Sequence, residues 1–136
     1  MSDDLTDGQR HRQGMQVRRE VLGQTHVEAA VARQDGFTAP FQDFITRTAW
    51  GDVWSRGGLD RRTRSMITLT ALVALGQEAE LRLHVRAALT NGVTREEISE
   101  VFLHTAIYAG VPAANSAYAA AQEVFASIEE ETRADD

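Results

Sequence analysis

The residues best suited to chemistry lie between Gln77 and Asn91, where the periodicity predicts a helix. At 100° per residue, Glu80, His84 and Asn91 project into the middle of the apolar arc of that helix. Burying a carboxylate and an imidazole is costly unless they are paired, and residues four apart can hydrogen-bond each other. The pattern favours a functional pocket, with a structural pair or a wet subunit interface as the alternative.

A second pair, Glu100 and His104, has the same spacing, and Tyr108 follows one turn later. This stripe lies at the edge of an apolar face, which favours a solvated or interface surface, with a functional histidine as the alternative. Two Glu-x-x-x-His pairs in a helical chain are also compatible with a carboxylate-bridged metal site. Di-iron bundles, however, use Glu-x-x-His and two further glutamates, which are not evident here, so we expect no metal.

Two further groups contain residue types that bind small anions or planar molecules. Trp50 and Trp54 lie one turn apart and share a face, which favours core or oligomer packing, with the wall of a substrate pocket as the alternative. Arg61, Arg62 and Arg64 cluster at the start of a predicted helix, where cations oppose the helix dipole. Such a cluster suits contact with an anion or with a neighbour's carboxylates.

Composition excludes much chemistry. The chain has 136 residues, 43% of them hydrophobic, which suits one compact domain. Cysteine is absent, so disulfides, thiolate nucleophiles and cysteine-bound metals are excluded. Lysine is also absent, which excludes lysine Schiff bases and a Walker A loop. The net charge of −6 argues against nucleic acid, and the longest apolar stretch, Met66 to Leu75, is about half a membrane span. With no signal peptide evident, we expect a cytoplasmic protein without a membrane partner.

Capping residues, glycines and prolines at the ends of helical segments predict an all-α protein, a compact bundle of about six or seven helices. We expect one domain over residues 1–136, with a core at about 14–127 and flexible acidic ends at 1–7 and 129–136. The first expected helices cover 9–22, 25–34 and a segment from Pro40 to the Gly57-Gly58 break. A central helix follows, capped by Asp60 and apolar nearly all round from Met66 to Leu75, and the next helix covers 77–91. The last two are a helix that is capped by Thr94 and Glu97 and ends at Gly110, and a helix from Pro112 to about Glu130.

Five segments together carry a resemblance to the carboxymuconolactone decarboxylase family: WGDVW at 50–54, LDRRTRS at 59–65, ELxxH at 80–84, NGVTxEEI at 91–98 and YAGVPAAN at 108–115. The resemblance covers about residues 14–127. Related alkylhydroperoxidase D-like proteins carry Cys-x-x-Cys before the histidine, and here Gln77 and Glu80 stand at the cysteine positions. Ser65 stands where those redox relatives usually have a proton-relay glutamate. The resemblance therefore excludes thiol peroxidase activity and implies an alkylhydroperoxidase D-like, oligomeric fold.

The resemblance implies an enzyme that decarboxylates a small dianionic lactone in the protocatechuate branch of the β-ketoadipate pathway. No cofactor is expected, because the lactone itself accepts the electrons that carbon dioxide leaves behind. The family also implies a homo-oligomer, a trimer or hexamer, with active sites near subunit contacts. Alternatives are a sister enzyme acting on another lactone or carbonyl acid, and a non-catalytic helical oligomer.

On this basis we assign hypothetical roles to nine residues. His84 donates a proton to the dienolate and Glu80 orients it. The remaining roles are substrate carboxylate binding by Arg64 and Arg61, donation to the lactone oxygen by His104 or Tyr108, an apolar wall from Trp50 and Trp54, and a substrate contact from Asn91.

Overall fold

A computed structural model describes residues 4–135, and within them the chain is all-α, as predicted. The chain divides into two compact units, unit 1 (Met1–Arg61) and unit 2 (Arg62–Asp136). The expectation of a single domain stays a prediction. No helix within residues 4–135 is both long enough and apolar enough to cross a membrane. The flexibility expected for residues 1–3 and for Asp136 falls outside the described residues.

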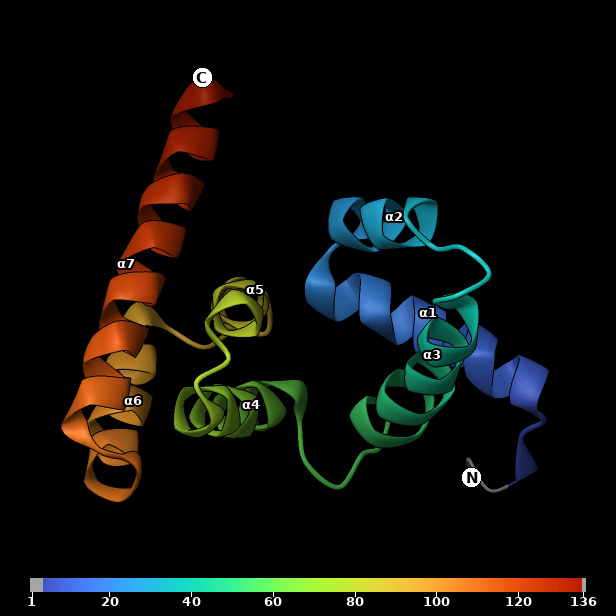
Figure 1. Ribbon diagram of the computed structural model, residues 1–136, viewed down its shortest axis with the longest axis horizontal. Helices are drawn as coiled ribbons and strands as arrows, with labels where there is room; N and C mark the ends of the chain where they lie inside the picture. Colours follow the sequence, from blue (N-terminus) through green and yellow to red (C-terminus); the bar gives the residue numbers. More distant parts are fainter. Residues whose placement is uncertain (1–3, 136) are drawn as a thin grey trace. The chain divides into compact units, whose positions relative to one another are not determined.

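From residue 4 onward, unit 1 contains three α-helices followed by a π-helix (Figure 1): α1 (Asp7–Leu22), α2 (Gln24–Ala32), α3 (Ala39–Ile45) and η2 (Thr46–Trp54). The first helix begins two residues earlier than predicted, because Thr6 and Gln9 form a reciprocal capping box that the sequence analysis missed. The segment from Pro40 to Trp54 is helical as predicted, but its second half is widened into the π form. Propensity and periodicity do not distinguish this form from an α-helix.

Two glycines let α1 and η2 pack backbone against backbone. A Cβ atom placed on Gly14 would lie 2.0 Å from the carbonyl oxygen of Thr46, and one on Gly51 would lie 2.7 Å from that of Arg10. Neither position has room for a side chain. The crossing of α1 and η2 therefore depends on glycine at both positions.

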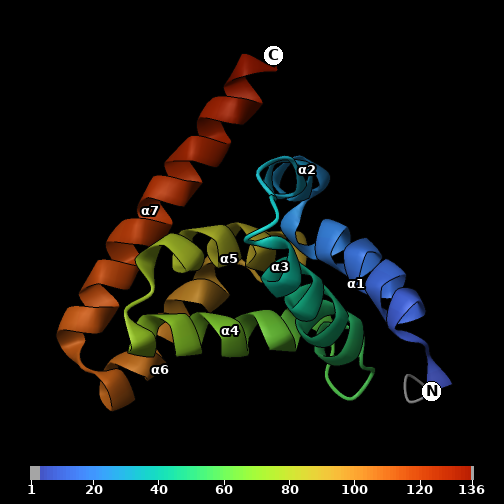
Figure 2. The same cartoon turned by 45° about the vertical axis from the view of Figure 1, so that its right-hand side comes forward.

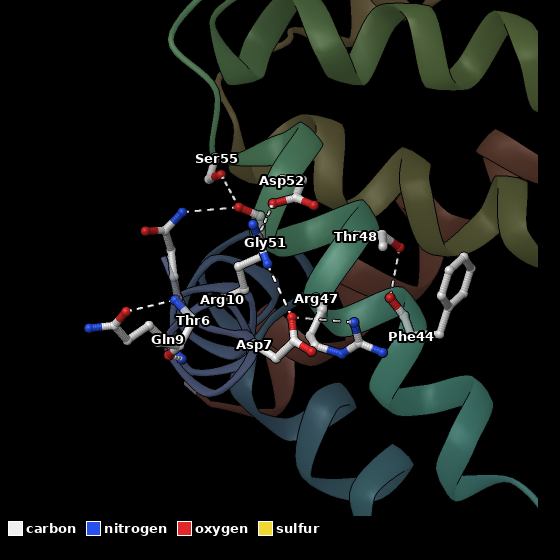
Figure 3. A network of polar contacts seen from close by, with 11 residues as sticks. Thr6, Asp7, Gln9, Arg10, Phe44, Arg47, Thr48, Gly51, Asp52 and Ser55 are labelled. Carbon is white, nitrogen blue, oxygen red and sulfur yellow. Dashed lines mark hydrogen bonds and ion pairs between the residues drawn. The ribbon is translucent and has the colours of Figure 1, made fainter. Parts of the chain in front are cut away.

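Polar contacts surround this crossing (Figure 3). Arg10 of α1 forms ion pairs of 3.1 Å with Asp7 and with Asp52 of η2. The carbonyl of Gly51 accepts a hydrogen bond from the Gln13 side chain at 3.0 Å and another from the Ser55 hydroxyl. Side chains thus satisfy a carbonyl in the widened helix and tie η2 to α1.

Up to residue 135, unit 2 contains four helices around one apolar core: α4 (Arg61–Leu75), α5 (Glu78–Thr90), α6 (Arg95–Ala109) and α7 (Val111–Ala134). Figure 2 shows α4 and α5 side by side, and both α5 and α6 pack against α7. The capping box predicted at Thr94 and Glu97 is confirmed. The core is built from Leu69, Val73, Leu81, Val85, Ala88, Val93, Ile98, Phe102, Ala117, Ala120, Ala121 and Val124.

Two expectations for unit 2 are wrong. The helix α4 is not buried all round: Ser65, Leu69 and Val73 form its one buried stripe, whereas Ile67 is 54% exposed and Leu75 is 70% exposed. Apolar composition alone does not show which side finds a neighbour within one chain. The helix α7 also continues past Glu130 to Ala134.

Ion pairs explain the longer α7. Arg86 of α5 donates two hydrogen bonds of 3.0 Å to the carboxylate of Glu131, and Arg95 of α6 contacts Glu129 at 3.1 Å. Arg82 contacts Glu123 at 2.9 Å, and this hydrogen bond and charge raise the pKa of Arg82. The acidic residues at this end of the chain are thus held by arginines on two other helices.

Candidate active site

His84 is the most deeply buried ionisable residue among the described residues of unit 2. It lies in the middle of α5 and is 8% exposed, next to buried Leu81, Val85 and Ala88. Its Nδ1 atom is itself buried. Among residues 4–135, His84 and Arg18 are the two ionisable residues classed as buried. The position of His84 in the apolar arc is therefore confirmed, and an imidazole there is largely shielded from water.

Glu80, in contrast, is exposed, so its predicted burial in the apolar arc is wrong. The first turn of α5, from Glu78 to Glu80, is exposed on all sides, and burial begins at Leu81. The helical arc was predicted correctly, but burial along it starts only after the first turn. A carboxylate there gains from the helix dipole instead of from a buried partner. A hydrogen bond from the His84 imidazole to the carboxylate of Glu80 stays a prediction.

Asn91 is half-buried and closes the C-terminal end of α5. Gly92 follows with a φ of +92°, and the amide of Val93 donates to the carbonyl of Ala88 at 2.9 Å, which is a Schellman turn. The side-chain Nδ2 of Asn91 donates a hydrogen bond of 2.9 Å to the hydroxyl oxygen of Ser65. One of the two side-chain N–H groups of Asn91, which we expect to contact the substrate, therefore already donates a hydrogen bond within the protein.

The arginine cluster at the start of α4 meets carboxylates, as its composition suggested. Arg61 contacts Glu20 at 3.0 Å, and Arg62 forms an ion pair with Glu97 on α6. These pairs reduce the charge that both arginines offer to a ligand. Arg64 is half-buried in the same turn, and its role in substrate binding stays a prediction.

The second histidine pair lies on an exposed face of unit 2. Tyr108 is 81% exposed, and its ring centroid lies 5.2 Å from that of His104. His104 borders an open groove of about 510 Å³ between α4 and α6. The groove contains the carboxylates of Glu97 and Glu100, so it does not favour a dianion. The sequence-based expectation of a solvated or interface face is confirmed as far as exposure goes. The lining residues are Met66, Ile67, Thr70, Glu97, Glu100, Val101 and His104.

The two tryptophans belong to unit 1 and share a face of η2, as predicted. Their ring centroids lie 5.3 Å apart with an angle of 24° between the planes, which is a stacked arrangement. Trp50 is buried and Trp54 is half-buried. A contact between either ring and a substrate stays a prediction.

Sequence reasoning missed several buried polar residues, among them Arg18 and Ser65. Arg18 on α1 donates from Nη1 to the side-chain oxygen of Gln42 at 3.2 Å and lies 3.5 Å from the hydroxyl of Thr46. Ser65 is fully buried on the inner stripe of α4. Both interrupt apolar stripes at helical spacing, and that interruption was the available signal. Within residues 4–135, no group of three His, Asp or Glu side chains is placed to hold a metal ion.

Comparison with known proteins adds evidence of another kind. Residues 39–123 match the model of the carboxymuconolactone decarboxylase family. The chain is 51% identical over 124 residues to 4-carboxymuconolactone decarboxylase of Acinetobacter baylyi, covering 91% of this chain and 92% of that protein. It is 47% identical over 116 residues to nitrosuccinic acid decarboxylase npaB of Metarhizium robertsii, covering 82% of this chain and 81% of that protein.

Proposed function

The chain belongs to the carboxymuconolactone decarboxylase family, and from that premise we propose that it converts 4-carboxymuconolactone to 3-oxoadipate enol-lactone and carbon dioxide. This is the carboxy-lyase step of the protocatechuate branch of the β-ketoadipate pathway. The observation that carries the proposal is the 51% identity to a decarboxylase of that name, which extends over nine tenths of both chains.

The chemistry of the substrate explains why so few catalytic groups are needed. When the carboxylate on the quaternary ring carbon leaves as carbon dioxide, the electrons of the broken C–C bond move through the ring double bond to the lactone carbonyl. A dienolate results, and a proton delivered to carbon completes the reaction. The lactone is its own electron sink, so the proposal includes no cofactor. The protein has to bind a dianion, stabilise the developing oxyanion and supply one proton.

We assign the proton donation to His84. Histidine suits this task because its ordinary pKa lies near neutral pH. The burial of His84 among apolar residues of α5 supports the assignment, since a shielded donor delivers its proton to the substrate and not to water. Glu80 then acts on His84 from the preceding turn, and this part of the proposal requires the exposed carboxylate to reach the imidazole.

The remaining roles follow from charge and hydrogen-bonding capacity. Arginine binds carboxylates with two parallel hydrogen bonds, which supports a substrate contact for Arg64 and, less strongly, for Arg61. His104 or Tyr108 would donate to the lactone oxygen, Asn91 would contact a carboxylate, and Trp50 and Trp54 would form an apolar wall.

We also propose that the protein is a homo-oligomer, a trimer or hexamer. Exposed apolar side chains at the end of α6 and the start of α7 support self-association, because a cluster of such groups on a surface is typical of protein–protein contacts. Ile107 is 79% exposed, and Leu103, Tyr108 and Val111 are also exposed. The net charge of −6 gives no support to a nucleic-acid partner. A cytoplasmic location stays a prediction.

Nitrosuccinate is the second candidate substrate, favoured by the 47% identity to a nitrosuccinic acid decarboxylase. It too is a small dicarboxylate with its own electron sink, because a nitro group can accept the electrons released with carbon dioxide. The same protein groups would therefore serve both reactions.

The test is a direct comparison of the two substrates with one enzyme preparation. Carbon dioxide release is measured at several concentrations of each, and kcat/KM values are compared. We expect the lactone to be preferred by at least about tenfold, a difference of about 1.4 kcal/mol in transition-state binding. A preference for nitrosuccinate would replace the proposal with the second candidate.

A further inference from the structure

A partly buried hydrogen bond joins two of the helices that carry the proposed site. Ser65 is fully buried on the inner stripe of α4, together with Leu69 and Val73. Its hydroxyl oxygen accepts a hydrogen bond of 2.9 Å from Nδ2 of Asn91. A polar pair in an apolar contact loses its hydration, so it adds little stability compared with two apolar side chains. It does, however, fix the two helices in one relative position, because a hydrogen bond is directional.

The bond lies where its effect on the proposed site is greatest. Ser65 directly follows Arg64 in the first turns of α4. Asn91 comes seven residues, or two helical turns, after His84, so both lie on the same side of α5. The Ser65–Asn91 bond thus connects the turn that carries the proposed carboxylate ligand to the helix that carries the proposed proton donor.

The bond also orients the side chain of Asn91. The backbone of this residue is already fixed, because its amide donates to the carbonyl of Ala87 at 2.9 Å and the Schellman turn follows. A carboxamide carries two N–H donors and one acceptor oxygen. Ser65 takes one of these donors and thereby sets the directions of the other two groups. Because Asn91 is only half-buried, its amide can contact a ligand while it donates a hydrogen bond to Ser65.

We infer that Ser65 is a positioning residue of the decarboxylase site: it aims the carboxamide of Asn91 at a substrate carboxylate and fixes Arg64 relative to His84. Ser65 itself does not touch the substrate. The inference rests on the proposed function, and it adds a residue whose contribution is made entirely through its hydrogen bond to Asn91.

The test compares Ser65→Ala with Ser99→Ala. Ser99 makes the same kind of interhelical contact, with its hydroxyl oxygen 2.9 Å from that of Tyr118 on α7, but it joins other helices. Both variants lose one hydroxyl and are measured well below their unfolding temperatures. We expect kcat/KM for the lactone to fall by about tenfold in Ser65→Ala, because small misplacements are costly in catalysis, and to change less than about twofold in Ser99→Ala.

A double-mutant cycle separates positioning from a general structural role. If Ser65 acts through Asn91, the double variant Ser65→Ala with Asn91→Ala is no more impaired than Asn91→Ala alone. Should Ser65→Ala fail to fold, Ser65→Cys keeps the same side-chain geometry with a weaker acceptor, and an intermediate loss is expected. Additive losses, or equal kinetics for the two serine variants, would overturn the inference while the function stands. A wild-type protein that leaves the lactone unchanged overturns the proposed function and this inference with it.

Discussion

Glu80 and His84 lie on successive turns of α5, yet the glutamate is exposed while the histidine is 8% exposed. The spacing of four residues allows contact between the side chains, but the two environments differ sharply. If the Glu80 carboxylate acts on the His84 imidazole, it must do so electrostatically or by a hydrogen bond from the exposed end of the helix. Removal of that charge therefore gives a clear test.

We predict that Glu80→Gln lowers kcat by about 10²-fold, because His84, the proposed proton donor, loses the carboxylate that orients it. Glu78→Gln is the matched control, since Glu78 is an exposed carboxylate in the same first turn. Steady-state kinetics of both variants check the prediction. Equal, near-normal kcat values would show that Glu80 is only a surface charge at the helix N-terminus.

Arg64→Gln should raise KM by about 10-fold to 100-fold, because a hydrogen bond between charged groups is lost. Arg62→Gln removes the same charge from the same turn, and a much smaller rise in KM is expected because Arg62, which pairs with Glu97, has no assigned role in substrate binding. Isothermal titration with a non-reacting dicarboxylate analogue gives the affinities directly. The assignment fails if the two variants bind the analogue equally well.

Gly14→Ala should lower the free energy of unfolding by at least about 1–3 kcal/mol, because its Cβ atom would lie 2.0 Å from the carbonyl oxygen of Thr46. Gly8→Ala in the same helix is the control. Its nearest neighbours are flexible side chains at 3.7 Å or more, so alanine should stabilise α1 by about 0.5–1 kcal/mol. Urea denaturation measures both, and a Gly14→Ala protein as stable as the wild type would contradict the described crossing of α1 and η2.

The pKa of Asp35 should lie below its ordinary value of 3.8, because the backbone amides of Thr38 and Phe37 each donate a hydrogen bond of 3.0 Å to its carboxylate. A lowered pKa in the folded state gives stability that is present above about pH 4 and lost as the pH falls through the lowered value. Carbon-detected NMR titration reports the value directly. Asp35→Asn should therefore destabilise the protein at neutral pH and less so at low pH, and a measured pKa at or above 3.8 would refute the prediction.

The helical elements could be predicted from the sequence because their ends carry local signals. Thr94 with Glu97 begins α6, and Gly92 ends α5, through contacts within a few residues. The π form of η2 could not be predicted, because propensity and periodicity do not distinguish it from an α-helix. The exposure of Ile67 could not be predicted either, since periodicity marks an apolar face without naming its neighbour.

The candidate site was predicted unevenly for the same reason. His84 lies in the middle of its helix, where the apolar arc is truly covered, so its burial followed from spacing. Glu80 lies on the same arc but in an uncovered first turn. Ser65 could be recognised only as a polar interruption, because its partner Asn91 is 26 residues away in the chain. Contacts of that range depend on the tertiary fold.

The most direct test of the account is the release of carbon dioxide from 4-carboxymuconolactone, generated in situ, by the wild-type protein and by folded His84→Ala. Each is assayed with and without a chelator, and circular dichroism confirms the fold of the variant. We predict rapid, chelator-resistant turnover by the wild type and a loss of at least about 10²-fold in His84→Ala. Near-normal turnover by His84→Ala would contradict the central role of His84, and the absence of turnover by the wild type would contradict the proposed reaction.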